Sequence, residues 1–536
     1  MSTVLARAGA IDALTDEQRV AAAAKTTNTF IEAGPGTGKT TVSAHRFGVQ
    51  RFASHLRADS RAVVAISFTR AATFNLRQRV QRLWGPSALA WPHRIITLDT
   101  IMSDLVHDLL SAGLLVWPNQ TILWPDGKIV LDVHDSWASF SGSVWTRTTY
   151  DILVVAGQVV VRRGFKQESS SSIPPTVSVP LLQKGVCTHQ DVRDVLAQAL
   201  NDDVTADYVR GRLFSKFRAL IVDEVFDAND LDIAVIEAAI NAGVAFTLVG
   251  DPWQALYVFR GARPHVVPEL LKRTQVRTLP LTHSFRWRDD IQRDLAVSLR
   301  DGGSVVLPAV DSGGGLEDLD VVLALQWKSL WELGAGVLPL AFHGFKGGYE
   351  EAAAVLLLNH VTRSVFDLDA TYINNALTAL AIQDRAVPRL LEPDLQKVAE
   401  ILRAGGKSSV AAAYDQLIVA VKTFSPRHFK PVHHAYTKRL AQIQERLAHH
   451  QRPVPGLTTH QAKGSEWDVV GVRLTGSERA ALAGGLSVHN DQHRKLYVAC
   501  TRAHRRTVEV IPSPPPVKPR GQRRGPKPGS TDLGGL

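Results

Sequence analysis

Short apolar runs alternate with amphipathic, helix-like segments along most of the chain. Seven of these runs are bounded by turn residues and predict buried strands: 28–33, 61–68, 218–223, 245–250, 338–342, 468–472 and 507–511. Buried runs of this length, separated by helical segments, are typical of parallel strands joined by crossover helices. The pattern therefore predicts an α/β fold with two lobes.

Both lobes are expected to be interrupted by insertions. From about 117 to 163 the pattern indicates hairpins, with a Pro-Asp-Gly turn at 125–127, and the polar run 169–172 indicates a surface loop. The first lobe is expected at 1–112 and 206–300, with a partly β insertion at 113–205 and a glycine-rich linker after it at 301–325. The second lobe is expected at 326–360 and 451–511, with a reduced helical insertion at 361–450. A basic disordered tail is expected at 512–536.

Composition narrows the class of protein without deciding it. The 536 residues, 45% of them hydrophobic, are too many for one core, so several domains are expected. The formal net charge of +10 allows a polyanionic partner but does not require one. Two cysteines, Cys187 and Cys500, cannot form a disulfide framework or complete a zinc site by themselves. No run approaches the roughly 20 apolar residues of a membrane helix, and the first residues lack the order of a secretory signal, so we expect a cytoplasmic protein with no membrane partner.

The segment 33–41, Ala-Gly-Pro-Gly-Thr-Gly-Lys-Thr-Thr, has the spacing of a phosphate-binding loop between a strand and a helix. Backbone amides in such a loop surround phosphates, and the positive end of the following helix points at them. The predicted ligands are Gly34, Gly36, Thr37, Gly38, Lys39, Thr40 and Thr41, with Lys39 on the β and γ phosphates and the Thr40 hydroxyl on Mg²⁺.

A second carboxylate site follows the apolar run 218–222. Asp223 is expected to reach the same metal ion, and Glu224 to act as general base toward water. Alone, this pair would as often be a helix cap. Together with the phosphate loop it predicts hydrolysis of a nucleoside triphosphate.

Further segments resemble, in order, the motifs of the UvrD/PcrA/Rep family of superfamily 1A DNA helicases. They are Leu14–Arg19 for the Q motif, Ile66–Ala72 for Ia, Thr97–Ile101 for Ib, Leu248–Ala262 for III, Leu281–Arg286 for IV, Thr458–Asp468 for V and Leu496–Ala503 for VI. This resemblance implies two RecA-like domains that hydrolyse ATP with Mg²⁺. Its implied nucleotide contacts are Gln18 and Phe285 on the adenine, Gln254, Arg286 and Arg502 on the γ phosphate, and Glu466 on the ribose or a metal-linked water.

The resemblance also implies binding of single-stranded DNA or of a junction between single and double strands, with movement 3′ to 5′. Aromatic rings bind successive bases regardless of sequence. The implied strand contacts are Phe68, Tyr257 and Phe259 on bases, with Arg260 beside them, and His460 and Thr97 on phosphates. Phe68 and Phe259 could instead be ordinary core aromatics, since aromatic residues near strand ends are usually buried.

The chain also departs from that family. Motif II has Val225 and Phe226 where alanine and glutamine are usual, motif Ib has Asp99 where histidine is usual, and both insertions are short. Strand separation is therefore a weaker expectation than translocation. The first hypothesis is a DNA helicase in repair, recombination or replication. The alternatives are a DNA-stimulated ATPase or terminus sensor acting with a partner nuclease in anti-phage defence, and a non-catalytic nucleotide-gated binding protein. The basic tail resembles a minor-groove arm, but we expect a solvated, proline-broken terminus instead.

Overall fold

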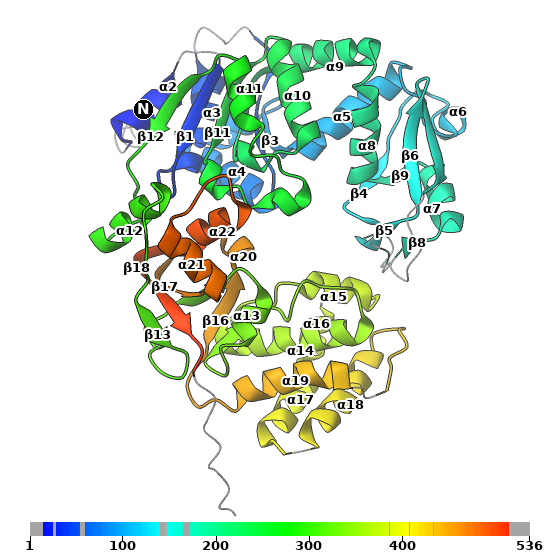
Figure 1. Cartoon of the computed structure of the whole chain (residues 1–536). Coiled ribbons are helices and arrows are strands. Elements are labelled where there is room, and N and C mark those ends of the chain that lie inside the picture. The colour runs from blue at the N-terminus through cyan, green and yellow to red at the C-terminus, as the bar shows by residue number, and fades with distance from the viewer. Residues whose placement is uncertain are drawn as a thin grey trace, which may run out of the picture.

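The structure is a computed structural model that describes residues 14–24, 28–53, 59–139, 145, 147–164, 172–384, 386–406, 408–431 and 434–513 (Figure 1). The predicted basic tail therefore lies outside the described residues, except for 512 and 513. The same is true of the polar run 169–172, except for Ser172. The structure confirms the α/β class, with two separate parallel sheets.

The first sheet has six parallel strands in the order β12-β1-β11-β10-β2-β3. Their bounds are β1 Asn28–Ala33, β2 Ala62–Ser67, β3 Arg94–Thr97, β10 Phe217–Val222, β11 Ala245–Gly250 and β12 Arg277–Leu281. Phe30 and Ile31 are neighbours on β1 and point into different cores. Both faces of the sheet are thus buried, which explains why the strands have continuous apolar sequences. The helices of this lobe are α2 Asp16–Ala23, α3 Lys39–Phe52, α4 Arg70–Trp84, α5 Leu98–Ser111, α9 Asp203–Lys216, α10 Asp230–Asn241 and α11 Val267–Arg273.

The first insertion combines short strands with helices. Its elements are α6 Gln120–Leu123, β4 Asp132–His134, β5 Arg147–Thr148, β6 Tyr150–Val155, β7 Gln158–Arg163, β8 Ser172–Ile173, α7 Pro175–Leu182, β9 Val186–Thr188 and α8 His189–Ala199. One hairpin, β6–β7, is present, and its turn residues Ala156 and Gly157 both have positive φ, as a tight two-residue turn requires. The hairpin predicted around 125–127 is wrong, because its first flank is helix α6 and its second flank does not pair with it.

One apolar core extends from the first sheet into this insertion, from Phe246 on β11 through Leu105 on α5 to Val192 on α8. The predicted boundary at 205 falls inside α9 and is therefore misplaced.

The second sheet also has six parallel strands, in the order β13-β18-β17-β14-β16-β15. Their bounds are β13 Ala309–Asp311, β14 Val321–Ala324, β15 Val337–Pro339, β16 Val454–Thr458, β17 Trp467–Arg473 and β18 Ala503–Ile511. The predicted linker at 301–325 is wrong, because β14 is a fully buried strand inside this sheet. The helices of this lobe are α12 Asp290–Arg300, α13 Trp327–Trp331, α20 Thr459–Ala462, α21 Gly476–Gly484 and α22 Asp491–Cys500. Leu299 of α12 belongs to the core of this lobe, so the predicted end of the first lobe at 300 is too late.

The second insertion is helical, and its core also includes Trp331 of α13 and Leu338 of β15 from the second lobe. Its helices are α14 Tyr349–Phe366, α15 Ile373–Ala379, α16 Val387–Leu390, α17 Glu392–Ala404, α18 Ser409–Lys422 and α19 His434–Leu447. The predicted start at 361 cuts through α14, whose residues from Ala352 onward already pack in this core. In Figure 1 the two sheets lie one above the other, and both insertions extend to the same side.

Both cysteines are buried and unbonded. Within the described ranges, none of the helices combines the length and apolarity needed to cross a membrane.

Arg193 on α8 joins the first insertion to the first lobe. Its guanidinium lies 2.7 Å from Asp99 Oδ1 on α5 and 3.0 Å from Asp232 Oδ1 on α10. Asp99, the unusual residue of motif Ib, is thus engaged in an intramolecular ion pair. The carboxylate of Asp232 is buried, and a buried charge that loses its partner costs about 3 to 5 kcal/mol.

We therefore expect Arg193→Met to lower the free energy of unfolding by about 3 kcal/mol, measured from the first transition in urea. Arg210→Met on α9 is the control. It removes an exposed ion pair with Asp207 and should cost less than about 1 kcal/mol. Equal effects of the two substitutions would contradict this account of Arg193.

Candidate nucleotide and strand site

The predicted phosphate loop connects β1 to α3. Gly36 and Gly38 have φ of 71° and 83°, in the left-handed region that favours glycine. A Cβ on Gly36 would also overlap the side chain of Arg286, so this position needs glycine for a second reason. Helix α3 begins at Lys39, which directs its N-terminal end toward the loop.

The predicted carboxylates follow β10. In the first sheet, β11 lies between β10 and β1, the strand that leads into the phosphate loop. The Asp223 amide donates to the carbonyl of Ile66 at 2.9 Å, which fixes the strand end. Glu224 has φ of 59°, a strained conformation for a residue with a side chain, and such strain is concentrated at functional sites. Lys39 Nζ lies 3.2 Å from Glu224 Oε1.

Burial and the charge of Glu224 raise the pKa of Asp223 to about 7. Burial would also raise the pKa of Glu224, but the charges of Lys39 and Lys463 outweigh it and lower that pKa to about 2. Glu224, the carboxylate that is placed as a general base, is therefore the more acidic member of the pair.

The two predicted arginines reach the same place from the other side. Arg286 follows β12 and donates to Thr501 O at 2.8 Å and to Glu466 Oε1 at 2.6 Å. Arg502 follows α22 and donates to Val498 O at 3.2 Å. Burial, reinforced by the charge of Arg286, lowers the pKa of Arg502 to about 9. Main-chain atoms of the second lobe thus hold both guanidinium groups in place.

Lys39, Arg286 and Arg502 line one cavity of about 690 Å³ between the lobes. Arg286 Nε and Arg502 Nη2 are buried there and make no hydrogen bond within the described part of the chain, whereas Lys39 Nζ is paired with Glu224. Buried cationic donors without acceptors are costly, so the cavity fits a ligand with several anionic oxygens. The same cavity is lined by other predicted nucleotide contacts: Gly34, Gly36, Thr37, Gly38, Thr40, Asp223, Glu224, Gln254, Phe285 and Glu466.

Two predicted adenine contacts, Gln18 and Phe285, also touch the phosphate loop. Gln18 Nε2 donates to Thr37 O at 2.9 Å, while Thr15 N donates to Gln18 Oε1 at 3.1 Å. Gln18 therefore contacts the phosphate loop directly. Phe285 is half-exposed at the rim, and its amide donates to Gly36 O at 3.0 Å.

One stripe of α4 was missed by the sequence interpretation. Asn75, Arg79 and Arg82 are spaced by four and three residues, so they share a helix face, and all three line the cavity. Arg79 donates a hydrogen bond to Thr41 Oγ1, next to the loop. The helical spacing after motif Ia was the available signal.

Several predicted strand contacts form a cluster, and one of its members, Tyr257, also lines this cavity. The rings of Phe259 and His460 are 5.0 Å apart, and those of Tyr257 and Phe259 are 6.1 Å apart. The guanidinium of Arg260 lies 5.2 Å from the Tyr257 ring and 5.4 Å from the Phe259 ring. Phe259 is 63% exposed, which does not fit a core aromatic. We call Tyr257, Phe259, Arg260 and His460 the aromatic cluster.

The other two predicted strand contacts, Phe68 and Thr97, are not members of the aromatic cluster. Phe68 packs partly against the first core and lines the nucleotide cavity. Thr97 precedes α5, and its hydroxyl lies 3.2 Å from that of Thr100.

Lys463 lies in the segment that resembles motif V, and the sequence alone indicates no function for it. Its ammonium donates to Asp227 Oδ2 at 2.6 Å and to Gln254 O at 2.9 Å. A lysine of the second lobe thus bonds to two residues of the first.

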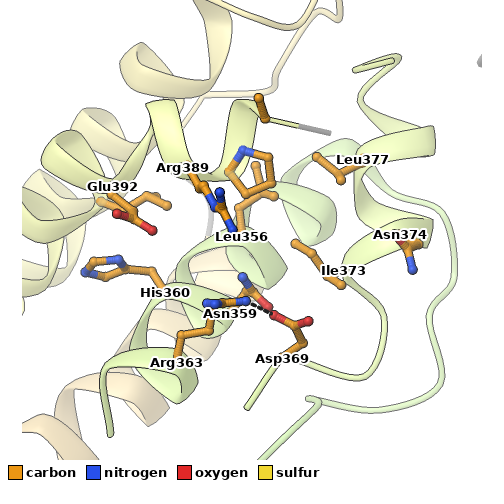
Figure 2. A pocket seen from close by; sticks show the side chains of 13 residues that line it. Leu356, Asn359, His360, Arg363, Asp369, Ile373, Asn374, Leu377, Arg389 and Glu392 are labelled. Atoms are coloured by element: carbon orange, nitrogen blue, oxygen red, sulfur yellow. Dashed lines mark hydrogen bonds and ion pairs between the residues drawn. The ribbon is translucent and has the colours of Figure 1, made fainter. Parts of the chain in front are cut away.

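A second cavity, of about 490 Å³, lies among α14, α15, α16 and α17 (Figure 2). Its two arginines, Arg363 and Arg389, are balanced by Asp369 and Glu392, and Arg363 donates to Asp369 at 2.7 Å. This balanced charge does not favour a polyanion.

The fold and the cavity define a P-loop protein with two parallel-sheet lobes. A family profile described as an AAA domain matches residues 16–260. DNA helicase II of Escherichia coli (strain K12) is 36% identical over 291 residues, 52% of this chain and 39% of that protein. ATP-dependent DNA helicase SRS2 of Saccharomyces cerevisiae (strain ATCC 204508 / S288c) is 23% identical over 309 residues, 52% and 26% of the two chains. RecBCD enzyme subunit RecB of Mycobacterium tuberculosis (strain CDC 1551 / Oshkosh) is 32% identical over 122 residues, 22% and 11%.

Over these segments the chain is similar to helicases of the UvrD/Rep type, and the order of its motifs agrees with that similarity. The chain spans about two fifths or less of the length of these relatives.

We expect Arg79→Ala to weaken nucleotide binding about 10- to 100-fold, because a charged hydrogen-bond donor is worth about 1.5 to 3 kcal/mol. Titration with a fluorescent ADP measures this directly. Arg403→Ala removes an exposed arginine of α17 and is the matched control. Identical affinities for the two variants would exclude Arg79 from the nucleotide site.

Proposed function

We propose that the protein is an ATP-dependent DNA motor, a helicase or translocase that moves 3′ to 5′ on single-stranded DNA in repair, recombination or replication. The observation that carries the proposal is the convergence of Lys39, Arg286 and Arg502 on one cavity, where Arg286 Nε and Arg502 Nη2 are buried and have no hydrogen-bond acceptor among the described residues. A triphosphate supplies the oxygens that these donors lack. The similarity to proteins named DNA helicases supports DNA as the second ligand.

The residues around the cavity suit phosphoryl transfer to water. Thr40 and Asp223 offer the hard oxygen ligands that Mg²⁺ prefers, and the bound ion would neutralise charge on the phosphates. Glu224, ionised and next to Lys39, is placed to accept a proton from water. Arg286 and Arg502 would stabilise charge on the transferred group, since a planar, permanently charged fork matches phosphate oxygens.

The division of the site between two lobes supports movement. A triphosphate held by Lys39 on one side and by Arg286 and Arg502 on the other favours the closed cleft, and its hydrolysis removes that bridge. A DNA strand lying across the aromatic cluster contacts both lobes, because His460 belongs to the second lobe and Phe259 to the first. Alternate closing and opening would then advance the strand.

A second candidate is a DNA-stimulated ATPase or terminus sensor that acts with a partner nuclease. The similarity to a protein named as an enzyme subunit favours a partner of some kind, and the short insertions favour translocation over unwinding. Strand displacement by the isolated protein would decide for the first candidate. Hydrolysis without displacement, together with a co-purifying nuclease, would decide for the second.

We expect ATP hydrolysis to be stimulated many-fold by single-stranded DNA, and Lys39→Ala to reduce the stimulated rate by about 100-fold or more, as for loss of one transition-state donor. Phosphate release with and without an oligonucleotide measures both rates. Lys328→Ala, at a position 84% exposed on α13, is the control. Two results would rule out the proposed motor: a wild-type rate of ATP hydrolysis that is the same with and without DNA, or a fully active Lys39→Ala variant.

We expect Phe259→Ala to weaken binding of single-stranded DNA by about 1 to 3 kcal/mol, the contribution of one stacked base. Fluorescence anisotropy with a labelled oligothymidylate gives the affinity. Phe214→Ala removes another exposed phenylalanine, on α9, and should leave the affinity unchanged. The stacking role is refuted if the two variants bind equally well.

A further inference from the structure

Lys463 is a buried cation that crosses between the lobes. It follows α20 in the second lobe, and its side chain is 11% exposed. Its two hydrogen-bond acceptors, Asp227 Oδ2 and Gln254 O, both belong to the first lobe. Closing or opening the cleft must therefore move Lys463 relative to these acceptors.

The same ammonium contacts both halves of the proposed chemistry. It lies 3.7 Å from Oε2 of Glu224 and 5.1 Å from the ring centre of Tyr257. Glu224 is the proposed general base, and Tyr257 belongs to the aromatic cluster. Lys463 thus contacts Glu224, which is proposed to act on water, and Tyr257, which is proposed to contact the strand.

The two residues of motif II between Glu224 and Asp227 offer no polar side chain that could connect Glu224 with Tyr257. Val225 and Phe226, between Glu224 and Asp227, are both buried in the first core, with Phe226 edge-on to Phe30 at 6.1 Å. Neither side chain can hydrogen-bond across the cleft. Asp227 Oδ1 is buried and has no hydrogen-bond partner within the described residues, so the carboxylate depends on Lys463 for its charge balance.

We propose that Lys463 is a positioning residue that couples strand binding at Tyr257 to the placement of the Glu224 carboxylate. A base stacked on the aromatic cluster fixes the Tyr257 ring and, through it, the ammonium above that ring. The ammonium, anchored on Asp227, then fixes the free oxygen of Glu224 opposite the oxygen that Lys39 contacts. This inference rests on the proposed function and names the side chain through which DNA stimulates hydrolysis.

The test compares Lys463→Met with a neutral pair, Lys463→Met with Asp227→Asn. The single variant leaves a buried carboxylate uncompensated and can fail to fold, whereas the double variant removes both charges and keeps the volume. ATP hydrolysis is measured with and without oligothymidylate, and the KM for ATP and the affinity for the oligonucleotide are measured separately. Lys216→Met, which breaks a partly buried ion pair with Asp108 away from the cavity, is the control.

We expect the ratio of stimulated to basal hydrolysis to fall at least tenfold in the neutral-pair variant, with the KM for ATP and the affinity for the strand changed less than about threefold. Lys463→Arg, which keeps the charge, should restore part of the ratio. A neutral-pair variant with the wild-type ratio, or one whose two rates fall together, overturns the inference. Absence of stimulation in the wild type would instead overturn the proposed function, so the two failures are distinguishable.

Discussion

The structure depends on positive charge that is collected in one cavity and only partly satisfied by hydrogen-bond acceptors of the described residues. Lys39 comes from the start of α3, whereas Arg286 and Arg502 are held by main-chain carbonyls of the second lobe. Their mutual repulsion and burial disfavour this arrangement, as the lowered pKa of Arg502 indicates. A ligand with several anionic oxygens would offset this repulsion and desolvation, and it would also connect the two lobes. In the proposed motor, nucleotide binding and closure of the cleft would therefore be one event.

The two sheets make this convergence possible. In the first sheet, parallel strands bring the phosphate loop after β1 and the carboxylates after β10 to one edge, with β11 between them. In the second lobe, Glu466 Oε1 and Thr501 O hold Arg286 and Val498 O holds Arg502, which would lower the reorganisation needed for the proposed hydrolysis. The aromatic cluster lies where motifs III and V meet. The predicted strand contacts and the predicted nucleotide contacts therefore both lie between the two lobes.

Local sequence was enough for features whose spacing carries the chemistry, such as the phosphate loop and the carboxylates after β10. It failed where distant segments decide. The flanks of 125–127 read as a hairpin, but the ring of Trp124 packs against Gly185 instead. Strand β14 was hidden by the glycine-rich segment before it, although Val321–Ala324 is fully apolar and buried. Arg79 and Lys463 acquire their interest from contacts across 38 and 236 residues, which no local pattern contains.

The account predicts that one triphosphate bridges the two lobes. A structure of the protein with a non-hydrolysable ATP analogue, Mg²⁺ and an oligothymidylate tests this most directly. The terminal phosphate should lie within hydrogen-bond distance of Lys39 and of at least one of Arg286 and Arg502. A nucleotide bound to Lys39 alone, with both arginines still turned to their main-chain partners, would contradict the account.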